Sequence, residues 1–174
     1  KGRVKIHTLY DIEAQAPAFF HITTASINDI KALPEIPYEK GAYYIFDRGY
    51  NDFSNLFKIE QIEATFVVRA KKNLKFKQTS WKRRLPKNVL SDSTIEFTVY
   101  KSSKDYPIPL RRVVYYDEEQ GRTFVFLTNN FVLPATMIAE LYHNRWSIEL
   151  FFKWLKQHLK IKKFWSTSEN AVRI

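Results

Sequence analysis

Residues 42–69 read AYYIFDRGYNDFSNLFKIEQIEATFVVR, and this stretch decides the class of fold. It opens with a short run of aromatic and β-branched residues that ends at Asp47, just before the turn-forming Gly49. Apolar residues then recur at helical spacing from Phe53 to Ile62, and the stretch closes with the β-rich run TFVVR. Strand, helix and strand in this order predict a βαβ unit, in which a helix covers two parallel strands.

Asp47 directly follows the first strand of this unit. In parallel α/β sheets the carboxyl ends of the strands are where ligands and reactive groups collect. A carboxylate in that position suits hard cations such as Mg²⁺ or Mn²⁺. The alternative is that Asp47 only forms the turn or caps the helix. Asp52 is better placed for capping, which leaves Asp47 available for another role.

The segments on either side of this unit add further strands. A hairpin of strands 4–10 and 18–24 is expected first, followed by a short helix. After the βαβ unit, three strands at 95–100, 110–116 and 123–127 are separated by turn signals. This second pattern predicts an antiparallel, β-rich insertion.

A long helix is predicted after the insertion. Pro134 begins it, because proline is favoured in a first helical turn, and we expect it to run to about residue 163. That length exceeds most globular helices, so a bend after Trp146 is expected. Its buried stripe is predicted to consist of Met137, Leu141, Ile148, Phe152, Leu155 and Leu159.

Four polar residues of this helix recur on one face. Tyr142, Arg145, Glu149 and Lys156 fall within an arc of about 60° when each residue turns the helix by ~100°. One carboxylate thus shares a face with two cations and a phenol, a set that can hold a metal ion beside a phosphate. An ordinary solvated face is the alternative. The apolar stripe places Glu149 at the margin of the buried face, where it can reach the end of a sheet.

A concentrated basic block lies between residues 64 and 91. The chain has a net charge of +10, and this block contains no acidic residue. Its cations are Arg69, Lys71, Lys72, Lys75, Lys77, Lys82, Arg83, Arg84 and Lys87. Interleaved with Phe76 and Trp81, they form the pattern expected of a protein that binds a phosphate backbone. A solubilising loop is the alternative, although such surfaces usually mix both signs of charge.

Composition excludes several classes of protein. With 45% hydrophobic and 16% aromatic residues among 174, the chain is too apolar to be disordered. It has no cysteine, so disulfides and thiolate metal sites are excluded and a reducing cytoplasm is the compatible compartment. No apolar run approaches the ~20 residues of a membrane span. The four histidines are scattered without zinc-ligand spacing, and no phosphate-binding glycine pattern is present.

Three stretches together carry a resemblance to a known family. LYHNRWSIELFFKWLKQHLKIKKF at 141–164, YYIFDRGYND at 43–52 and KGRVKIHTLYD at 1–11 match in order and spacing. In these features the chain resembles the DDE transposases of bacterial insertion sequences, specifically the insertion-sequence-four family. The resemblance covers nearly the whole chain.

The resemblance implies a fold and a reaction. The expected fold is α/β, a ribonuclease-H-like mixed sheet with helices, interrupted by a β-rich insertion. The expected reaction is metal-dependent cleavage and strand transfer of DNA, with two divalent cations, Mg²⁺ or Mn²⁺. Asp47 and Glu149 are the implied catalytic residues and metal ligands. The implied DNA-binding residues are Arg48, Tyr142, Arg145, Lys156, Lys71, Lys72, Trp81, Arg83 and Arg84, with Trp146 and Trp165 as rivals to Trp81 for stacking on an unpaired base.

The resemblance also implies organisation, partners and location. Residues 1–69 are expected to form the first part of the catalytic core, 70–131 the insertion, and 132–174 the helical remainder of the core. The expected partners are the terminal repeats of an insertion sequence and target DNA, with a homodimer in the synaptic complex, no membrane, and a location at the nucleoid of a bacterial cytoplasm.

One departure from the family pattern leaves activity open. The strand expected to carry the first catalytic aspartate is not in these residues, so we expect the chain alone to bind DNA without cleaving it. Two further readings stay open. One is a non-catalytic DNA-binding module from a decayed or repurposed transposase, and the other is a related nuclease without strand transfer.

Overall fold

The computed structural model describes residues 4–11, 13–24, 29–146, 150, 153, 157 and 172–173. The central part follows the prediction closely. Strands β3 (Tyr43–Phe46) and β4 (Thr65–Arg69) pair in parallel, and helix α1 (Phe53–Gln61) connects them. Asp52 caps α1 as expected, because its side chain accepts a hydrogen bond of 3.1 Å from the backbone N–H of Asn55. The βαβ unit is therefore confirmed.

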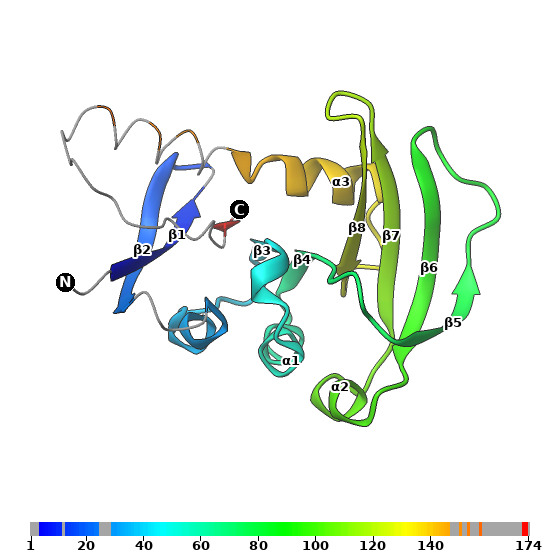
Figure 1. Cartoon of the computed structure of the whole chain (residues 1–174), viewed down its shortest axis with the longest axis horizontal. Coiled ribbons are helices and arrows are strands. Elements are labelled where there is room, and N and C mark those ends of the chain that lie inside the picture. Colours follow the sequence, from blue (N-terminus) through cyan, green and yellow to red (C-terminus); the bar gives the residue numbers. More distant parts are fainter. Residues whose placement is uncertain are drawn as a thin grey trace.

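In the described part of the chain, nine strands form one sheet in the order β2-β1-β9-β3-β4-β8-β7-β6-β5 (Figure 1). β1 (Val4–Asp11) and β2 (Ala16–Thr24) form the predicted antiparallel hairpin, followed by the 3₁₀ helix Asp29–Glu35. β9 (Val172–Arg173) lies between β1 and β3, parallel to the former and antiparallel to the latter.

The segment from 70 to 131 continues the sheet as antiparallel strands, as the turn signals predict. Its strands are β5 (Phe76–Trp81), β6 (Val89–Phe97), β7 (Leu110–Asp117) and β8 (Arg122–Thr128), and the short helix α2 (Tyr100–Asp105) joins β6 to β7. β8 pairs antiparallel with β4, which attaches the whole segment to the βαβ unit.

Two elements of this segment were not predicted. β5 and α2 are largely exposed, so neither carries the alternation or periodicity of a half-buried element. β5 is the last strand of the sheet, where cationic side chains are typical of a protected edge. The pattern also placed the start of β6 at residue 95, whereas the strand begins at Val89.

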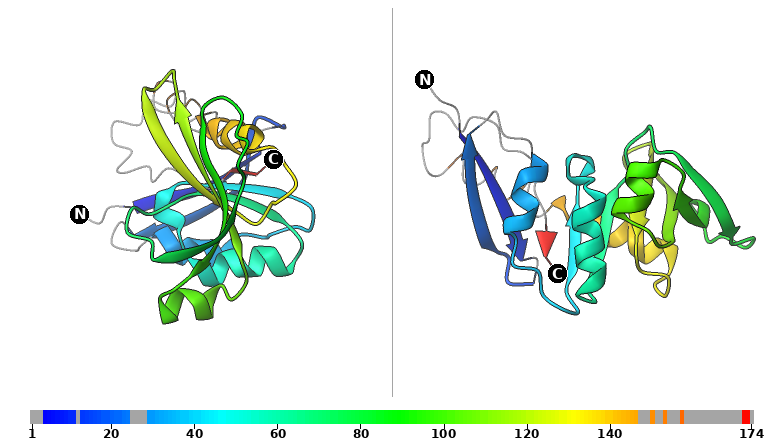
Figure 2. Two further views of the ribbon diagram at one scale, coloured as in Figure 1. Left: turned by 90° about the vertical axis from the view of Figure 1, so that its right-hand side faces the viewer. Right: turned by 90° about the horizontal axis from the view of Figure 1, so that it is seen from below.

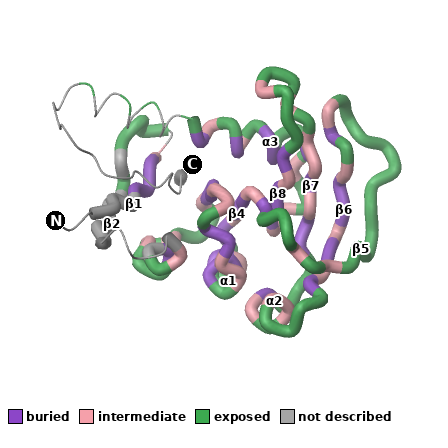
Figure 3. The backbone as a smooth tube through the Cα atoms, in the orientation of Figure 1, coloured by how far each residue is buried: buried purple, intermediate pink, exposed green. Residues whose placement is uncertain are grey.

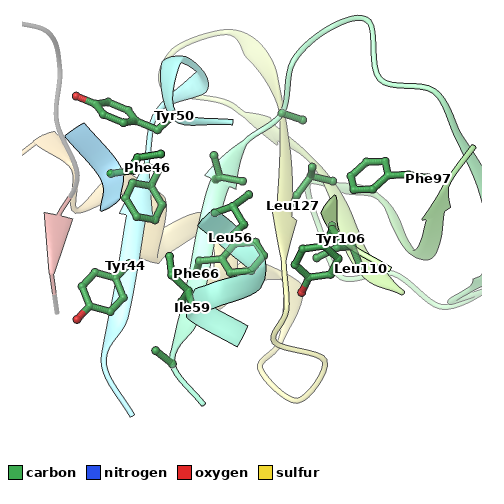
Figure 4. Packing of buried hydrophobic residues seen from close by; sticks show 14 of the residues in the cluster. Tyr44, Phe46, Tyr50, Leu56, Ile59, Phe66, Phe97, Tyr106, Leu110 and Leu127 are labelled. Atoms are coloured by element: carbon green, nitrogen blue, oxygen red, sulfur yellow. The ribbon is translucent and has the colours of Figure 1, made fainter. Parts of the chain in front are cut away.

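Buried apolar residues form two clusters, one on each face of the sheet, and Figure 3 marks the buried positions along the backbone. Because side chains alternate along a strand, Tyr44 and Phe46 of β3 face α1, whereas Ile45 faces the opposite side. The α1 face contains the larger cluster, with Phe66, Leu56, Ile59, Tyr106 and Leu110 (Figure 4). Helix α3 (Ala135–His143) covers the other face, and Figure 2 (left) shows α3 on one side of the strands with α1 and α2 on the other.

Helix α3 differs from the long helix that the sequence predicted. Pro134 precedes it as the N-cap, and the helix ends at His143. A tighter turn follows, in which the N–H of Arg145 donates to the carbonyl of Tyr142 at 3.1 Å. This turn interrupts the helix before Trp146, and the predicted bend after Trp146 falls mostly outside the described residues, of which Trp146, Leu150, Lys153 and Gln157 are helical.

The predicted buried stripe of this helix is only partly right where it can be checked, since Leu141 is half-buried against the core but Met137 is exposed. Met137 is 40% exposed, and the buried face consists of Ala135, Ile138, Ala139 and Tyr142. The prediction followed the largest apolar side chains, whereas a close approach of α3 to the sheet favours the small alanines. Residues 148, 152, 155 and 159 of the stripe lie outside the described residues.

A mixed sheet with a parallel βαβ unit, a β-rich segment and a helix on the opposite face is the ribonuclease-H-like architecture that we expected. None of the described helices is long and apolar enough to cross a membrane.

Candidate active site

Asp47 occupies the carboxyl end of β3, as predicted. It immediately precedes the single 3₁₀ turn Arg48–Tyr50, and its own carbonyl accepts the N–H of Tyr50 at 3.0 Å. Strand alternation continues from Ile45, so the side chain of Asp47 lies on the α3 face. The turn redirects the chain at the point where the carboxylate emerges from the sheet.

Two side chains from distant parts of the chain meet the Asp47 carboxylate. The Tyr142 hydroxyl donates to Oδ1 at 2.7 Å across a separation of 95 residues. The Nη1 atom of Arg69, at the end of β4, lies 3.7 Å from the same oxygen. The side chains of Asp47 and Arg69 are 20% and 21% exposed, so this group lies at the border between core and solvent.

The surroundings of Asp47 keep it ionised. Burial by itself would raise the pKa of Asp47, but the hydrogen bond from Tyr142, the backbone N–H of Arg48 and the charges of Arg145 and Arg69 outweigh burial and lower the pKa. Burial raises the pKa of Tyr142 to about 12, a direction that the neighbouring Asp47 charge reinforces and Arg145 opposes. At neutral pH the phenol is therefore a donor and the carboxylate an acceptor.

A cluster of aromatic rings on β8 packs against the Tyr142 side chain of this site. Phe124 and Phe126 of β8 lie with their ring centres 5.7 and 4.8 Å from that of Tyr142. The guanidinium of Arg145 is 5.5 Å from the centre of the Tyr142 ring, and its side chain is buried. This pairing follows from the 3₁₀ turn after α3, because residues three apart are eclipsed in such a turn.

The backbone next to Asp47 is fixed by side-chain hydrogen bonds. Asn51 is buried, and its Nδ2 donates at 2.8 Å to the carbonyls of both Arg48 and Arg69. The Nε atom of Arg48 donates to the carbonyl of Ala70 at 3.1 Å. These bonds tie the end of β3 to the end of β4. Arg48, predicted to assist in DNA binding, thus has a role in holding the two strand ends together.

Strand direction brings the predicted basic residues to the same edge of the sheet. β3 and β4 end at this edge, β8 begins there because it is antiparallel to β4, and by the same alternation the β5–β6 loop lies there. In Figure 1 this loop and the β7–β8 turn are at the top, with α2 at the opposite end of the strands. The exposed residues there include Lys71, Lys72, Arg83 and Arg84, together with Trp81, which is 62% exposed.

The remaining predicted site residues, Glu149 and Lys156, lie outside the described residues. The predicted approach of Glu149 to Asp47 therefore stays a prediction. Of the helical set, Tyr142 and Arg145 are close to Asp47 as the spacing indicated. Both are buried on the sheet side of α3, and not on a solvated face of it.

A pocket of about 410 Å³ lies between α3 and the β7–β8 turn. Tyr142, Arg145 and Trp146 line it on the helix side, and Arg122 and Phe124 line it on the sheet side. Acidic residues contribute the rest of its charge: Asp117, Glu118, Glu119 and Glu140. The pocket therefore contains both arginine and carboxylate side chains, with Arg122 opposite Asp117 at the β7–β8 turn.

The chemistry of Asp47 is that which a hard cation requires of a ligand, and one carboxylate alone would supply only part of a metal site. Mg²⁺ is commonly held by one or two carboxylates, with water and substrate phosphate oxygens completing its shell. The lowered pKa keeps Asp47 in the required ionised form. Across the described ranges, no group of three acidic, histidine or cysteine side chains could hold a metal ion. A further ligand must therefore come from another source, for which Glu149 is the candidate within this sequence.

Two arginines of this site were not predicted beside Asp47: Arg69 was named only as part of the basic block, and Arg122 was not named at all. Arg69 ends β4 just as Asp47 ends the parallel strand beside it, so the βαβ pattern contained the signal. Arg122 begins β8, and its guanidinium lies 4.5 Å from the centre of the Phe124 ring. This contact is local, because residues two apart in a strand share one face, but its position near the site depends on the pairing of β8 with β4.

Comparisons with known proteins agree with the geometry. The family model described as "Transposase DDE domain" matches residues 1–174. A protein of Sinorhizobium fredii whose name describes it as a transposase, y4zB, is 39% identical over 181 residues, covering 99% of this chain and 50% of the relative. A protein of Geobacillus stearothermophilus named as a transposase of insertion sequence element IS5377 is 32% identical over 173 residues, covering 99% and 45%. The chain thus spans about half the length of the curated relatives it matches.

Proposed function

Because this chain belongs to the DDE transposase family, we propose that it contributes to metal-dependent cleavage and strand transfer of DNA at the ends of an insertion sequence. The contact that carries this proposal is the 2.7 Å hydrogen bond from Tyr142 to Asp47. It joins the two sequence motifs of the family resemblance at the end of a central strand. The roles of these residues are proposals, and they rest on this geometry together with the family.

In this proposal, Asp47 and Glu149 hold divalent cations, Mg²⁺ or Mn²⁺, which activate the attacking oxygen and stabilise the leaving oxygen of a phosphodiester. Arg69 and Arg145 lie near Asp47, and their positive charges suit them to bind a phosphate. Tyr142 holds the Asp47 carboxylate in one orientation. Lys156 is proposed to contact DNA as the spacing of the motif implies.

The edge of the sheet supplies the proposed DNA surface. Four exposed cations at this edge suit the phosphates of a duplex. They are Lys71 and Lys72 after β4, and Arg83 and Arg84 in the β5–β6 loop. Trp81 ends β5 at the same edge and is open to an unpaired base. The partners proposed are the terminal repeats and target DNA, with a second copy of the protein in the synaptic complex.

Cleavage is tested with Asp47→Asn. The variant is made in the chain and in a version extended to the length of the curated relatives, and nicking of a labelled terminal-repeat duplex is measured with Mg²⁺ or Mn²⁺. We expect cleavage only in the longer version, and its loss in Asp47→Asn with DNA binding retained. Asp105→Asn is the matched control, because Asp105 ends α2 at the opposite end of the strands.

The outcomes separate the proposed function from its alternatives. Cleavage without joining of the cut end to target DNA would favour a nuclease. Binding without cleavage in either version would favour a DNA-binding module. Cleavage that survives in Asp47→Asn would contradict the assignment of Asp47.

The salt dependence of DNA binding tests the proposed surface. Each phosphate neutralised on duplex DNA adds ~0.9 to the slope of log affinity against log salt. Replacing Lys71, Lys72, Arg83 and Arg84 together by glutamine should flatten that slope by up to about 3.6, four times this value. An unchanged slope would show that these residues are only a solvated face.

A further inference from the structure

Arg122 and Arg69 come from different strands and contact the same aromatic ring. Their guanidinium carbons lie 4.5 and 5.2 Å from the centre of the Phe124 ring. Phe124 is buried, so its position is fixed by the core. A cation held against an aromatic face loses part of its freedom while its N–H groups stay available at the edge. Contact with the same buried ring therefore limits the positions of both arginines.

The charges of these arginines are not fully neutralised by the groups around them. Arg122 is exposed, and within the described residues no ion pair includes it. Asp117 lies opposite Arg122 in the sheet and keeps its charge, but within the described residues no ion pair joins the two. The adjacent Glu118 pairs with Lys87 at 3.2 Å. Arg69 contacts Asp47, at the long distance of 3.7 Å.

Topology places this pair of arginines next to the carboxylate of the active site. β8 neighbours β4, and β4 neighbours β3, so Arg122 begins a strand two positions from the one that ends at Asp47. With a spacing of ~4.8 Å between strands, the two strands lie about 10 Å apart, and because Arg69 pairs with Phe126, Arg122 lies a further four residues, about 13 Å, along β8. Asp47, Arg69 and Arg122 also share the α3 face, since each follows the alternation of buried residues on that face.

We infer that Arg122 and Arg69, held against Phe124, form a phosphate-binding site for the DNA backbone beside Asp47. Two guanidinium groups offer several N–H donors to one phosphodiester, and such charge-assisted contacts are among the strongest polar interactions. The site rests on the proposed function and adds to it a position for a backbone phosphate on the β8 side of the carboxylate. Arg122 is the new DNA-contacting residue in this inference.

The test measures the affinity of the chain for a labelled duplex of mixed sequence, by fluorescence anisotropy across a series of salt concentrations. Arg122→Gln should reduce the slope of log affinity against log salt by about 0.9, the contribution of one phosphate. Arg122→Lys keeps the charge and should keep the slope. Lys101→Gln is the control, because it removes one exposed charge in α2 at the opposite end of the strands.

Each result decides the question. Equal slopes for Arg122→Gln and Lys101→Gln would overturn the inference, provided circular dichroism shows both variants folded. If Arg122→Gln does not fold, Arg69→Gln takes its place with the same expected reduction, and an unchanged slope there overturns the inference. If the unaltered chain does not bind the duplex, the proposed function itself fails. If only the quadruple basic variant flattens the slope, the proposed function stands without this site.

Discussion

Two carboxylate–arginine pairs in the same sheet differ in contact distance and in exposure to solvent. We call Asp92–Arg111 the closed pair and Asp47–Arg69 the open pair. Asp92 of β6 and Arg111 of β7 are joined by two hydrogen bonds of 2.8 Å, and their side chains are 4% and 2% exposed. The Nη1 atom of Arg111 also donates to the carbonyls of Asn130 and Leu133. Asp47 and Arg69 make one longer contact of 3.7 Å, and about a fifth of each side chain is exposed.

The difference indicates which pair serves structure and which can serve chemistry. Arg111 uses its donors within the protein and fastens the turn before α3 to the sheet. Arg69 lies over an aromatic ring and only approaches its carboxylate, so it can turn to an incoming phosphate. Both aspartates have a lowered pKa, although burial opposes this in each case. A lowered pKa alone therefore does not identify the functional carboxylate.

The largest loss of folding stability is expected when the Asp92–Arg111 pair is broken. Arg111→Met should lower the free energy of unfolding by about 3 to 5 kcal/mol, because it leaves Asp92 buried with only Lys82 as a charged partner. Urea denaturation monitored by tryptophan fluorescence measures this loss. Adding Asp92→Asn should restore part of it, since the uncompensated charge is then removed. A loss below about 1 kcal/mol would mean that the pair is not a structural fastening.

An intermediate loss of folding stability is expected when the Tyr142 hydroxyl, which donates to Asp47, is removed. Tyr142→Phe should cost about 1.5 to 3 kcal/mol at neutral pH, the usual range for a hydrogen bond to a charged group. Tyr116→Phe, at a half-exposed tyrosine of β7, should cost much less. Equal costs for both variants would show that the Tyr142 hydroxyl contributes nothing through Asp47.

The stability lost in Tyr142→Phe should depend on pH at both the acid and the alkaline end of the range. Because the pKa of folded Asp47 lies below its ordinary value near 3.8, the stability it contributes is present above that value and is lost as pH falls through the folded pKa. Because the pKa of folded Tyr142 is raised to about 12, its contribution is present below pH ~10 and is lost as pH rises toward 12. The difference between the unaltered chain and Tyr142→Phe should thus shrink at both ends of a pH series of urea midpoints. A constant difference would contradict the hydrogen bond.

The smallest loss of folding stability is expected for Lys82, the exposed second partner of Asp92. Lys82 lies 2.9 Å from Asp92, but its side chain is 55% exposed. Lys82→Gln should cost at most about 1 kcal/mol, since solvent and salt screen such a contact. A loss as large as that of Arg111→Met would show that Lys82 compensates the buried charge as much as Arg111 does. The measurement is the same urea series at low and high salt.

Local patterns in the sequence were sufficient for the βαβ unit and for Asp47. Aromatic and β-branched residues, helical spacing and a cap at Asp52 agree with one another there, so short-range chemistry determines the structure. The same reasoning failed where burial is decided by distant neighbours. Met137 is exposed, because packing against the sheet buries the helix face that carries Ala135, Ile138, Ala139 and Tyr142, and Met137 lies on another face.

The sequence by itself determined the class of fold, the basic character of the block from 64 to 91 and the family motifs around Asp47 and Tyr142. These features depend on residue type and short spacing. Only the tertiary structure decided that Tyr142 is buried against Asp47, that Arg69 and Arg122 meet at Phe124, and that Arg111 is a structural residue. Each of these contacts is made by strand pairing or helix packing between segments far apart in the chain, and such pairing leaves no local signal.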